Sequence, residues 1–201
     1  MRVPSIIRSF DHLHCPRLIA SAISMLGCMP AFGQQTTVTA VNTAIANHPA
    51  GSVSLLAPLK IVGGGAQANG TGNGSLLTQS QPGAPGQNAW VGGAEDHLVA
   101  DPATLSVYAI GLTDPKDDWE VIVREATSMP AQHPVTSVEL PKGYVMTGGG
   151  CTANWRTSPN AAGNLLTASF PSSLSSWECR SKDHGVSSPA TLTAYVIQTS
   201  R

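Results

Sequence analysis

The sequence predicts an all-β protein built from two tandem antiparallel modules, each a β-sandwich or a barrel-like fold. The first observation is composition: only 11 % of the residues are charged, whereas the chain has 20 glycines and 15 prolines. These two residues disfavour long helices, because glycine exposes the backbone and proline lacks an amide donor. The second is an internal repeat, and the third is a series of about six short strand candidates per repeat, separated by turn residues.

The repeat is visible when the chain is compared with itself. Three pairs of segments match: GGGAQAN (63–69) with GGGCTAN (148–154), GSLLTQSQP (74–82) with GNLLTASFP (163–171), and LSVYAIGL (105–112) with LTAYVIQT (192–199). The offset between matched residues drifts from 85 to 89 and then to 87, so length changes fall in loops. Copy one covers residues 34–112, a charged linker with a proline covers 113–118, and copy two covers 119–201.

The last strand of copy one, Leu105 to Ile110, is apolar on both faces. Successive side chains of a strand point to opposite faces, so such a strand belongs in the middle of a sheet that is covered twice. A module of about 80 residues buries a limited core. We therefore expect the two copies to pack against each other, with pseudo-twofold symmetry.

Residues 1–33 have the pattern of a signal peptide. A basic stretch ends at Arg17, an apolar core follows from Leu18 to Met29, and Ala31-Phe32-Gly33 forms a cleavage site. The apolar core is shorter than the about 20 residues of a membrane-spanning helix. Cleavage near Gly33 would give a secreted or periplasmic protein. In an alternative interpretation, Leu26-Gly27-Cys28 is a lipoprotein attachment site.

The charge and the cysteines agree with export. The formal net charge is -1 and the mature part has no cluster of basic residues, which makes nucleic acid an unsuitable partner. Two of the four cysteines, Cys15 and Cys28, precede the cleavage site. The other two, Cys151 and Cys179, are predicted to form a disulfide, since exported proteins meet an oxidising environment.

Each copy carries a tryptophan followed by an Asp-His pair, and these residues are the candidate ligand-binding site: Trp90, Asp96 and His97, and Trp177, Asp183 and His184. An exposed tryptophan beside an aspartate can hold a sugar ring. In the alternative interpretation, each tryptophan anchors a core and each aspartate bonds the local backbone. Neighbouring residues on a strand point to opposite faces, which disfavours a metal site or a Ser80-His97-Asp96 triad.

The triple glycines, Gly63 to Gly65 and Gly148 to Gly150, are a weak phosphate-loop signal. A phosphate loop precedes the N-terminus of a helix, and no helical pattern follows either run. We interpret them as β-bulges or as points where the backbone is closely approached.

Together these motifs resemble an uncharacterised bacterial secreted module with a Cys-Pro-x-Gly entry, a V-x-GGG strand, a S-x-P turn, a tryptophan strand and a closing v-Y-A-I strand. Both copies match along nearly their whole length. Ala57-Pro58 and Leu140-Pro141 stand in place of the Cys-Pro entry, so the resemblance implies that the family's usual disulfide is lost. The resemblance implies a fold and no activity.

We expect a non-catalytic secreted binding or surface module that needs no cofactor, with carbohydrate or a cell surface as its partner. One alternative is a structural or adhesive building block. A second alternative is a hydrolase, although the chain has no GxSxG motif.

Overall fold

The computed structural model describes residues 35–72, 74–155 and 163–200, and their regular structure is β throughout, with no α-helix. The all-β prediction is confirmed. The predicted signal peptide lies outside the described residues. The strands are β1 (Thr36–Asn42), β2 (Ala50–Ser54), β3 (Leu59–Ala68), β4 (Ser75–Pro82), β5 (Ala89–Asp96), β6 (Leu105–Thr113), β7 (Glu120–Thr127), β8 (Val135–Glu139), β9 (Val145–Asn154), β10 (Leu165–Pro171), β11 (Ser176–Lys182) and β12 (Thr191–Ser200).

The two copies share one strand pairing. In copy one the strands pair in the orders β1-β6-β3 and β2-β5-β4, and in copy two in the orders β7-β12-β9 and β8-β11-β10. All pairs are antiparallel, and equivalent residues stand opposite each other: Val38 pairs with Ile110 in copy one, and Val123 pairs with Ile197 in copy two. The sequence repeat is therefore a structural repeat of six strands.

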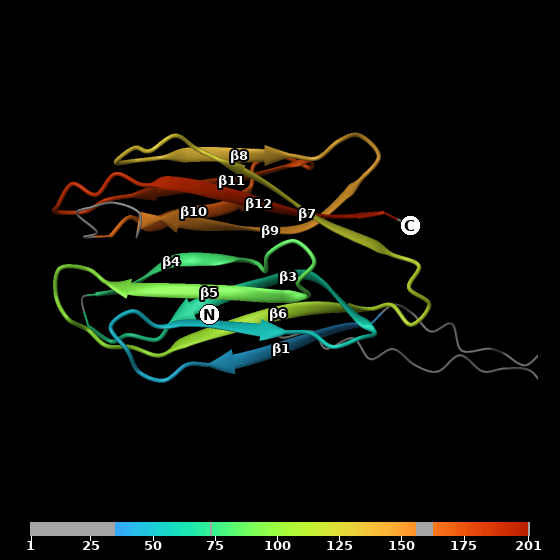
Figure 1. Cartoon of the computed structure of the whole chain (residues 1–201), viewed down its shortest axis with the longest axis horizontal. Helices are drawn as coiled ribbons and strands as arrows, with labels where there is room; N and C mark the ends of the chain where they lie inside the picture. The colour runs from blue at the N-terminus through green and yellow to red at the C-terminus, as the bar shows by residue number, and fades with distance from the viewer. Residues whose placement is uncertain (1–34, 73, 156–162, 201) are drawn as a thin grey trace, which may run out of the picture. The chain divides into compact units, whose positions relative to one another are not determined.

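A joint between β4 and β9 connects the copies (Figure 1). The two strands pair through Gln79 with Thr152 and through Ser80 with Cys151, which produces a six-stranded sheet in the order β2-β5-β4-β9-β12-β7. The described residues of both copies form one compact unit. Because β4 and β9 are not counterparts in the repeat, the joint is not itself twofold, and pseudo-twofold symmetry stays a prediction.

Glycine at the joint allows this close approach of two backbones. A Cβ atom on Gly150 would lie 2.4 Å from the backbone oxygen of Ser80, and one on Gly148 would lie 2.9 Å from that of Val62. The counterpart of Gly150 in copy one is Gly65, and a Cβ atom there would meet nothing within 4 Å. The triple glycine of copy two thus contacts copy one, as the interpretation of the run as a point of close approach predicts.

Each copy encloses a core between its two sheets. Copy one buries mainly aliphatic side chains and one tryptophan, and Ile197 of copy two joins this cluster, fully buried. The residues of the first core are Val53, Leu55, Ile61, Trp90, Ala94, Leu105, Val107, Ala109 and Ile197. The second core contains Val138, Leu140, Cys151, Ala153, Cys179, Leu192, Ala194 and Val196. The contribution of Ile197 to the first core makes the copies energetically interdependent.

A disulfide connects the two sheets of copy two. Cys151 on β9 bonds to Cys179 on β11, and both residues are fully buried. The corresponding residues of copy one are Ala66 and Gly92, and a Cβ atom on Gly92 would lie 2.8 Å from the Ala66 Cβ. The sheets of copy one are therefore too close at this point for a second disulfide, which needs a Cβ separation of about 3.8 Å.

Candidate functional site

The predicted site contains two tryptophans, and the structure gives both a packing role. Trp90 is only 1 % exposed and its indole lies against Gly64, where a Cβ atom would come within 2.3 Å of the ring. Its Nε1 donates to Ser80 Oγ at 3.1 Å. Trp90 therefore presents no ring face to a sugar, in agreement with the core-anchor alternative.

Trp177 repeats this arrangement in copy two. Its ring packs on Gly149, again with 2.3 Å to a hypothetical Cβ, and its Nε1 donates to Ser169 Oγ at 3.1 Å. It is half-buried rather than buried. The middle glycine of each triple run thus makes room for an indole.

The two predicted aspartates hold the loops that follow β5 and β11. Asp96 Oδ2 accepts a hydrogen bond from the Asp101 backbone N–H at 2.9 Å, and Asp183 Oδ2 accepts one from that of Ser188 at 2.9 Å. In both copies the hydrogen bond joins residues that are five apart in the sequence, so both loops are closed in the same way. This is the local-backbone role of the alternative interpretation.

The four histidines of the described residues take part in three different contacts. His97 is buried and its ring centroid lies 4.8 Å from that of the exposed His184. His133 Nε2 lies 3.4 Å from Asp183 Oδ1, whereas its counterpart His48 packs near Trp155 with 5.9 Å between ring centroids. The structure therefore brings His97 and His184 together, whereas each tryptophan packs on the middle glycine of the triple run of its own copy.

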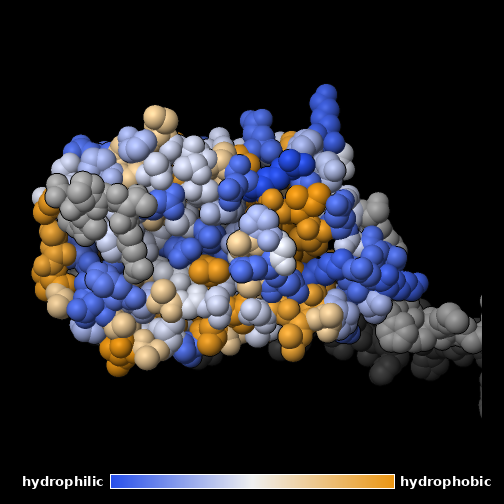
Figure 2. Space-filling model, viewed as in Figure 1, coloured by the Kyte–Doolittle hydropathy of each residue, from blue (hydrophilic) through white to orange (hydrophobic). Residues whose placement is uncertain are grey.

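A groove that was not predicted from the sequence lies between copy one and β7. It has a volume of about 460 Å³ and is walled mainly by aliphatic side chains. The lining residues are Ala57, Leu59, Lys60, Ile61, Pro85, Gly86, Gln87, Asn88, Val121, Ile122 and Val123. Figure 2 shows an apolar patch, bordered by hydrophilic residues, in the area where Figure 1 draws β7.

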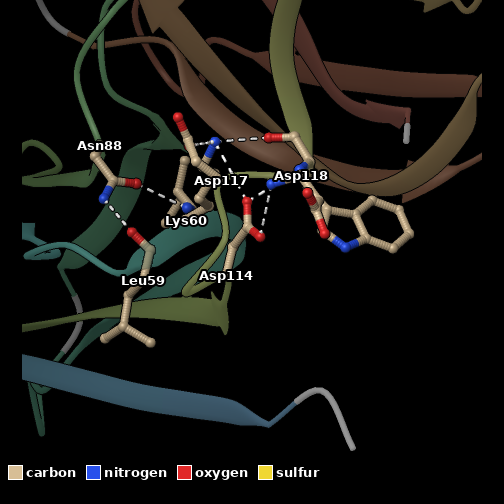
Figure 3. A network of polar contacts seen from close by, with 8 residues as sticks. Leu59, Lys60, Asn88, Asp114, Asp117 and Asp118 are labelled. Atoms are coloured by element: carbon tan, nitrogen blue, oxygen red, sulfur yellow. Dashed lines mark hydrogen bonds and ion pairs between the residues drawn. The ribbon is translucent and has the colours of Figure 1, made fainter.

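A polar network fixes one end of this groove (Figure 3). Lys60 Nζ donates to the Trp119 carbonyl at 2.6 Å, pairs with Asp117, and lies 3.5 Å from Asp114 Oδ2. The buried Asp114 also accepts the backbone N–H groups of Asp118 and Trp119, each at 3.0 Å. The predicted linker is thus a structured turn that leads directly into β7.

These contacts move two pKa values away from their ordinary range. Burial of Asp114 opposes its ionisation, but the N–H groups of Trp119 and Asp118 and the Lys60 ammonium outweigh burial and lower its pKa. The hydrogen bond to Asp117 raises the pKa of Lys60. Both groups are therefore charged at neutral pH.

Asn88 lines the groove, and its side-chain amide is fully hydrogen-bonded. Its Nδ2 donates to the carbonyl oxygens of Leu55 at 3.0 Å and Leu59 at 2.7 Å, and its Oδ1 accepts the Ile61 backbone N–H at 2.7 Å. Asn88 thus satisfies the backbone of copy one and keeps no amide hydrogen for a ligand. A single asparagine between strands gave no signal in the sequence.

Two further findings concern the described residues alone. Their histidine, cysteine, aspartate and glutamate side chains include no group of three or more that could hold a metal ion. No helix among them is long and apolar enough to cross a membrane.

Comparison with known proteins yields neither a matching protein family nor a matching curated protein.

Proposed function

We propose that this chain is a secreted, non-catalytic binding module whose ligand is an extended polypeptide segment with apolar side chains. The observation that carries the proposal is the aliphatic groove along β7. Secretion follows from the predicted signal peptide and from the resemblance to a bacterial secreted module, and the buried Cys151–Cys179 disulfide is compatible with it.

The position of β7 favours a peptide. β7 is the last strand of the six-stranded sheet, paired on one side with β12, so its other edge carries backbone groups with no strand partner among the described residues. An extended peptide can add a strand to such an edge through backbone hydrogen bonds. The groove that β7 lines would then receive alternate apolar side chains of the peptide.

The chemistry of the groove disfavours the glycan that we first expected. Its lining includes no aromatic side chain on which a sugar could stack. The amide of Asn88 bonds the backbone, and Lys60 bonds Asp117 and the Trp119 carbonyl. Few polar groups are left to bind hydroxyls, whereas Leu59, Ile61 and Val121–Val123 supply apolar surface.

The network at Lys60 supports affinity through rigidity. Asp114 closes the turn that precedes β7, and Lys60 attaches this turn to β3. The groove walls on β3 and β7 are therefore held in place before a ligand arrives. A preformed site avoids part of the ordering cost of binding.

Selection from a displayed library of random linear peptides tests the proposal. We expect the full chain to enrich peptides with apolar residues at alternate positions. The Ile122→Lys variant places a charge in the groove and should weaken binding of an enriched peptide at least tenfold. Thr37→Lys is the matched control, since Thr37 is the exposed counterpart of Ile122 on β1. The thermal midpoints of both variants verify folding.

Three outcomes would contradict the proposal. Equal binding by the wild type and Ile122→Lys would place the peptide elsewhere. Binding on a glycan array without peptide enrichment would restore the glycan hypothesis. No binding in either assay would favour the structural or adhesive building block.

A further inference from the structure

The contact between His97 and His184 joins equivalent residues of the two copies. His97 directly follows the last residue of β5, His184 lies two residues after the end of β11, and their ring centroids lie 4.8 Å apart. We propose that this histidine pair binds one divalent transition-metal ion of the zinc, copper or nickel class, and that the ion bridges copy one and copy two. The inference is independent of the peptide groove.

The environment of His97 is the first argument. Its side chain is only 7 % exposed, and neither Nδ1 nor Nε2 has a hydrogen-bond partner among the described residues. Buried polar groups are normally hydrogen-bonded, and an exception indicates a bound partner or a functional role. A neutral imidazole with a free ring nitrogen is a preferred ligand of zinc, copper and nickel.

The separation of the rings is the second argument. A tetrahedral ion binds histidine nitrogens at about 2.0 Å, and two imidazoles on one such ion have centroids about 5 Å apart. The observed 4.8 Å needs little adjustment. His184 is exposed, so an ion at the pair is accessible from solvent. Since no third ligand converges there among the described residues, water completes the coordination.

The stiffness of the two loops is the third argument. Asp96 and Asp183 each close the loop that carries the neighbouring histidine, through the hydrogen bonds to Asp101 and Ser188. Gly185 allows the two loops to come close, because a Cβ atom at this position would lie 2.7 Å from Leu98 Cδ1. The φ angle of Gly185 is 77°, which also favours glycine. The histidines are thus positioned by the fold before an ion binds.

Calorimetric titration with ZnCl₂ and electron paramagnetic resonance with CuSO₄ test the inference on the full chain, purified without a histidine tag. His12, His14 and Cys15 precede the predicted cleavage site and can bind metal themselves. The double variant His97→Gln/His184→Ala therefore defines the background. We expect the wild type to bind one more ion per chain than this variant.

The single variants identify the ligands. His184→Ala changes an exposed side chain and should fold normally. It should weaken zinc binding at the bridging site at least tenfold and reduce the copper signal from two nitrogen donors to one. His133→Ala is the matched control, because His133 is an exposed histidine of copy two that contacts Asp183 rather than His97. It should bind like the wild type.

Zinc should also raise the thermal midpoint of the wild type and of His133→Ala, and raise that of His184→Ala by less, because an ion that binds only the folded chain stabilises it in proportion to its affinity. Equal stoichiometry in the wild type and the double variant would overturn the inference. So would a loss of the extra ion in His133→Ala but not in His184→Ala.

Discussion

The indole of Trp90 lies on the Cα of Gly64, with no room for a side chain between the two strands. A Cβ atom at position 64 would lie 2.3 Å from the ring and 2.4 Å from the Tyr108 carbonyl oxygen. Gly64→Ala should therefore lower the free energy of unfolding by about 3 kcal/mol, the upper range for overpacking a core. Urea denaturation measures this change.

Gly65→Ala is the control for that substitution. Its Cβ atom would point into open space, and the residue is a neighbour on the same strand. We expect its free energy of unfolding to stay within about 0.5 kcal/mol of the wild type. If both variants lost the same free energy of unfolding, the contact with Trp90 would not be the reason why Gly64→Ala is destabilising.

The contact between the copies predicts different effects at two matched isoleucines. Ile197 is fully buried in the core of copy one, whereas its counterpart Ile110 is 36 % exposed. Ile197→Ala should cost about 2 to 5 kcal/mol, the range for a cavity in a core, and Ile110→Ala about 1 kcal/mol or less. Equal costs in chemical denaturation would contradict the packing of copy two on copy one.

The disulfide predicts a redox dependence of stability. Cys151 and Cys179 are 28 residues apart in sequence, and closing such a loop should stabilise the fold by about 3 to 4 kcal/mol in the chain-entropy account. Reduction with dithiothreitol, or the double variant Cys151→Ala/Cys179→Ala, should lower the urea midpoint accordingly. The reductant should then have no effect on the double variant, and a further shift there would contradict this origin.

Asp114 predicts a loss of stability in acid. Its pKa is lower in the folded chain than its unfolded value of about 3.9. Its ionisation therefore stabilises the fold fully above about pH 4, and this stabilisation is lost as the pH falls through the lowered native pKa. The urea midpoint of Asp114→Asn should be lower than that of the wild type at about pH 7. Between about pH 5 and pH 2 it should fall less than the wild-type midpoint does.

The control for Asp114 is Asp117→Asn. Asp117 also pairs with Lys60, but its side chain is 83 % exposed, and exposed ion pairs contribute little. Its acid profile should resemble that of the wild type. If Asp117→Asn flattened the acid profile as strongly as Asp114→Asn, the effect would belong to the Lys60 pair and not to the backbone hydrogen bonds of Asp114.

The repeat explains how much of the fold was predictable. Two copies served as an alignment, so the strand pattern and the packing role of the glycines followed from the sequence. The pairing of β4 with β9 could not be predicted from the sequence. The residues that pair there, Gln79, Ser80, Thr152 and Cys151, show no pattern that distinguishes a strand joined to the other copy from a free edge strand. Long-range pairing depends on how whole copies dock, which local patterns do not encode.

The site was less predictable than the fold. The tryptophans and the Asp-His pairs were chosen as site candidates because both copies have them. Residues are also shared between copies when they pack in the same way, as Trp90 does on Gly64. The groove lies between copy one and β7 of copy two, and Ile122 on β7 stands where copy one has Thr37. The β7 side of this groove is therefore marked by a residue that differs between the copies, not by one that they share.

The shared six-stranded sheet also has a consequence for the order of synthesis. β4 is complete long before β9 has been made, so copy one emerges with an unpaired edge strand and with a core that still lacks Ile197. Open strand edges are templates for aggregation. Until copy two has been made, copy one therefore carries an open sheet edge that copy two later covers.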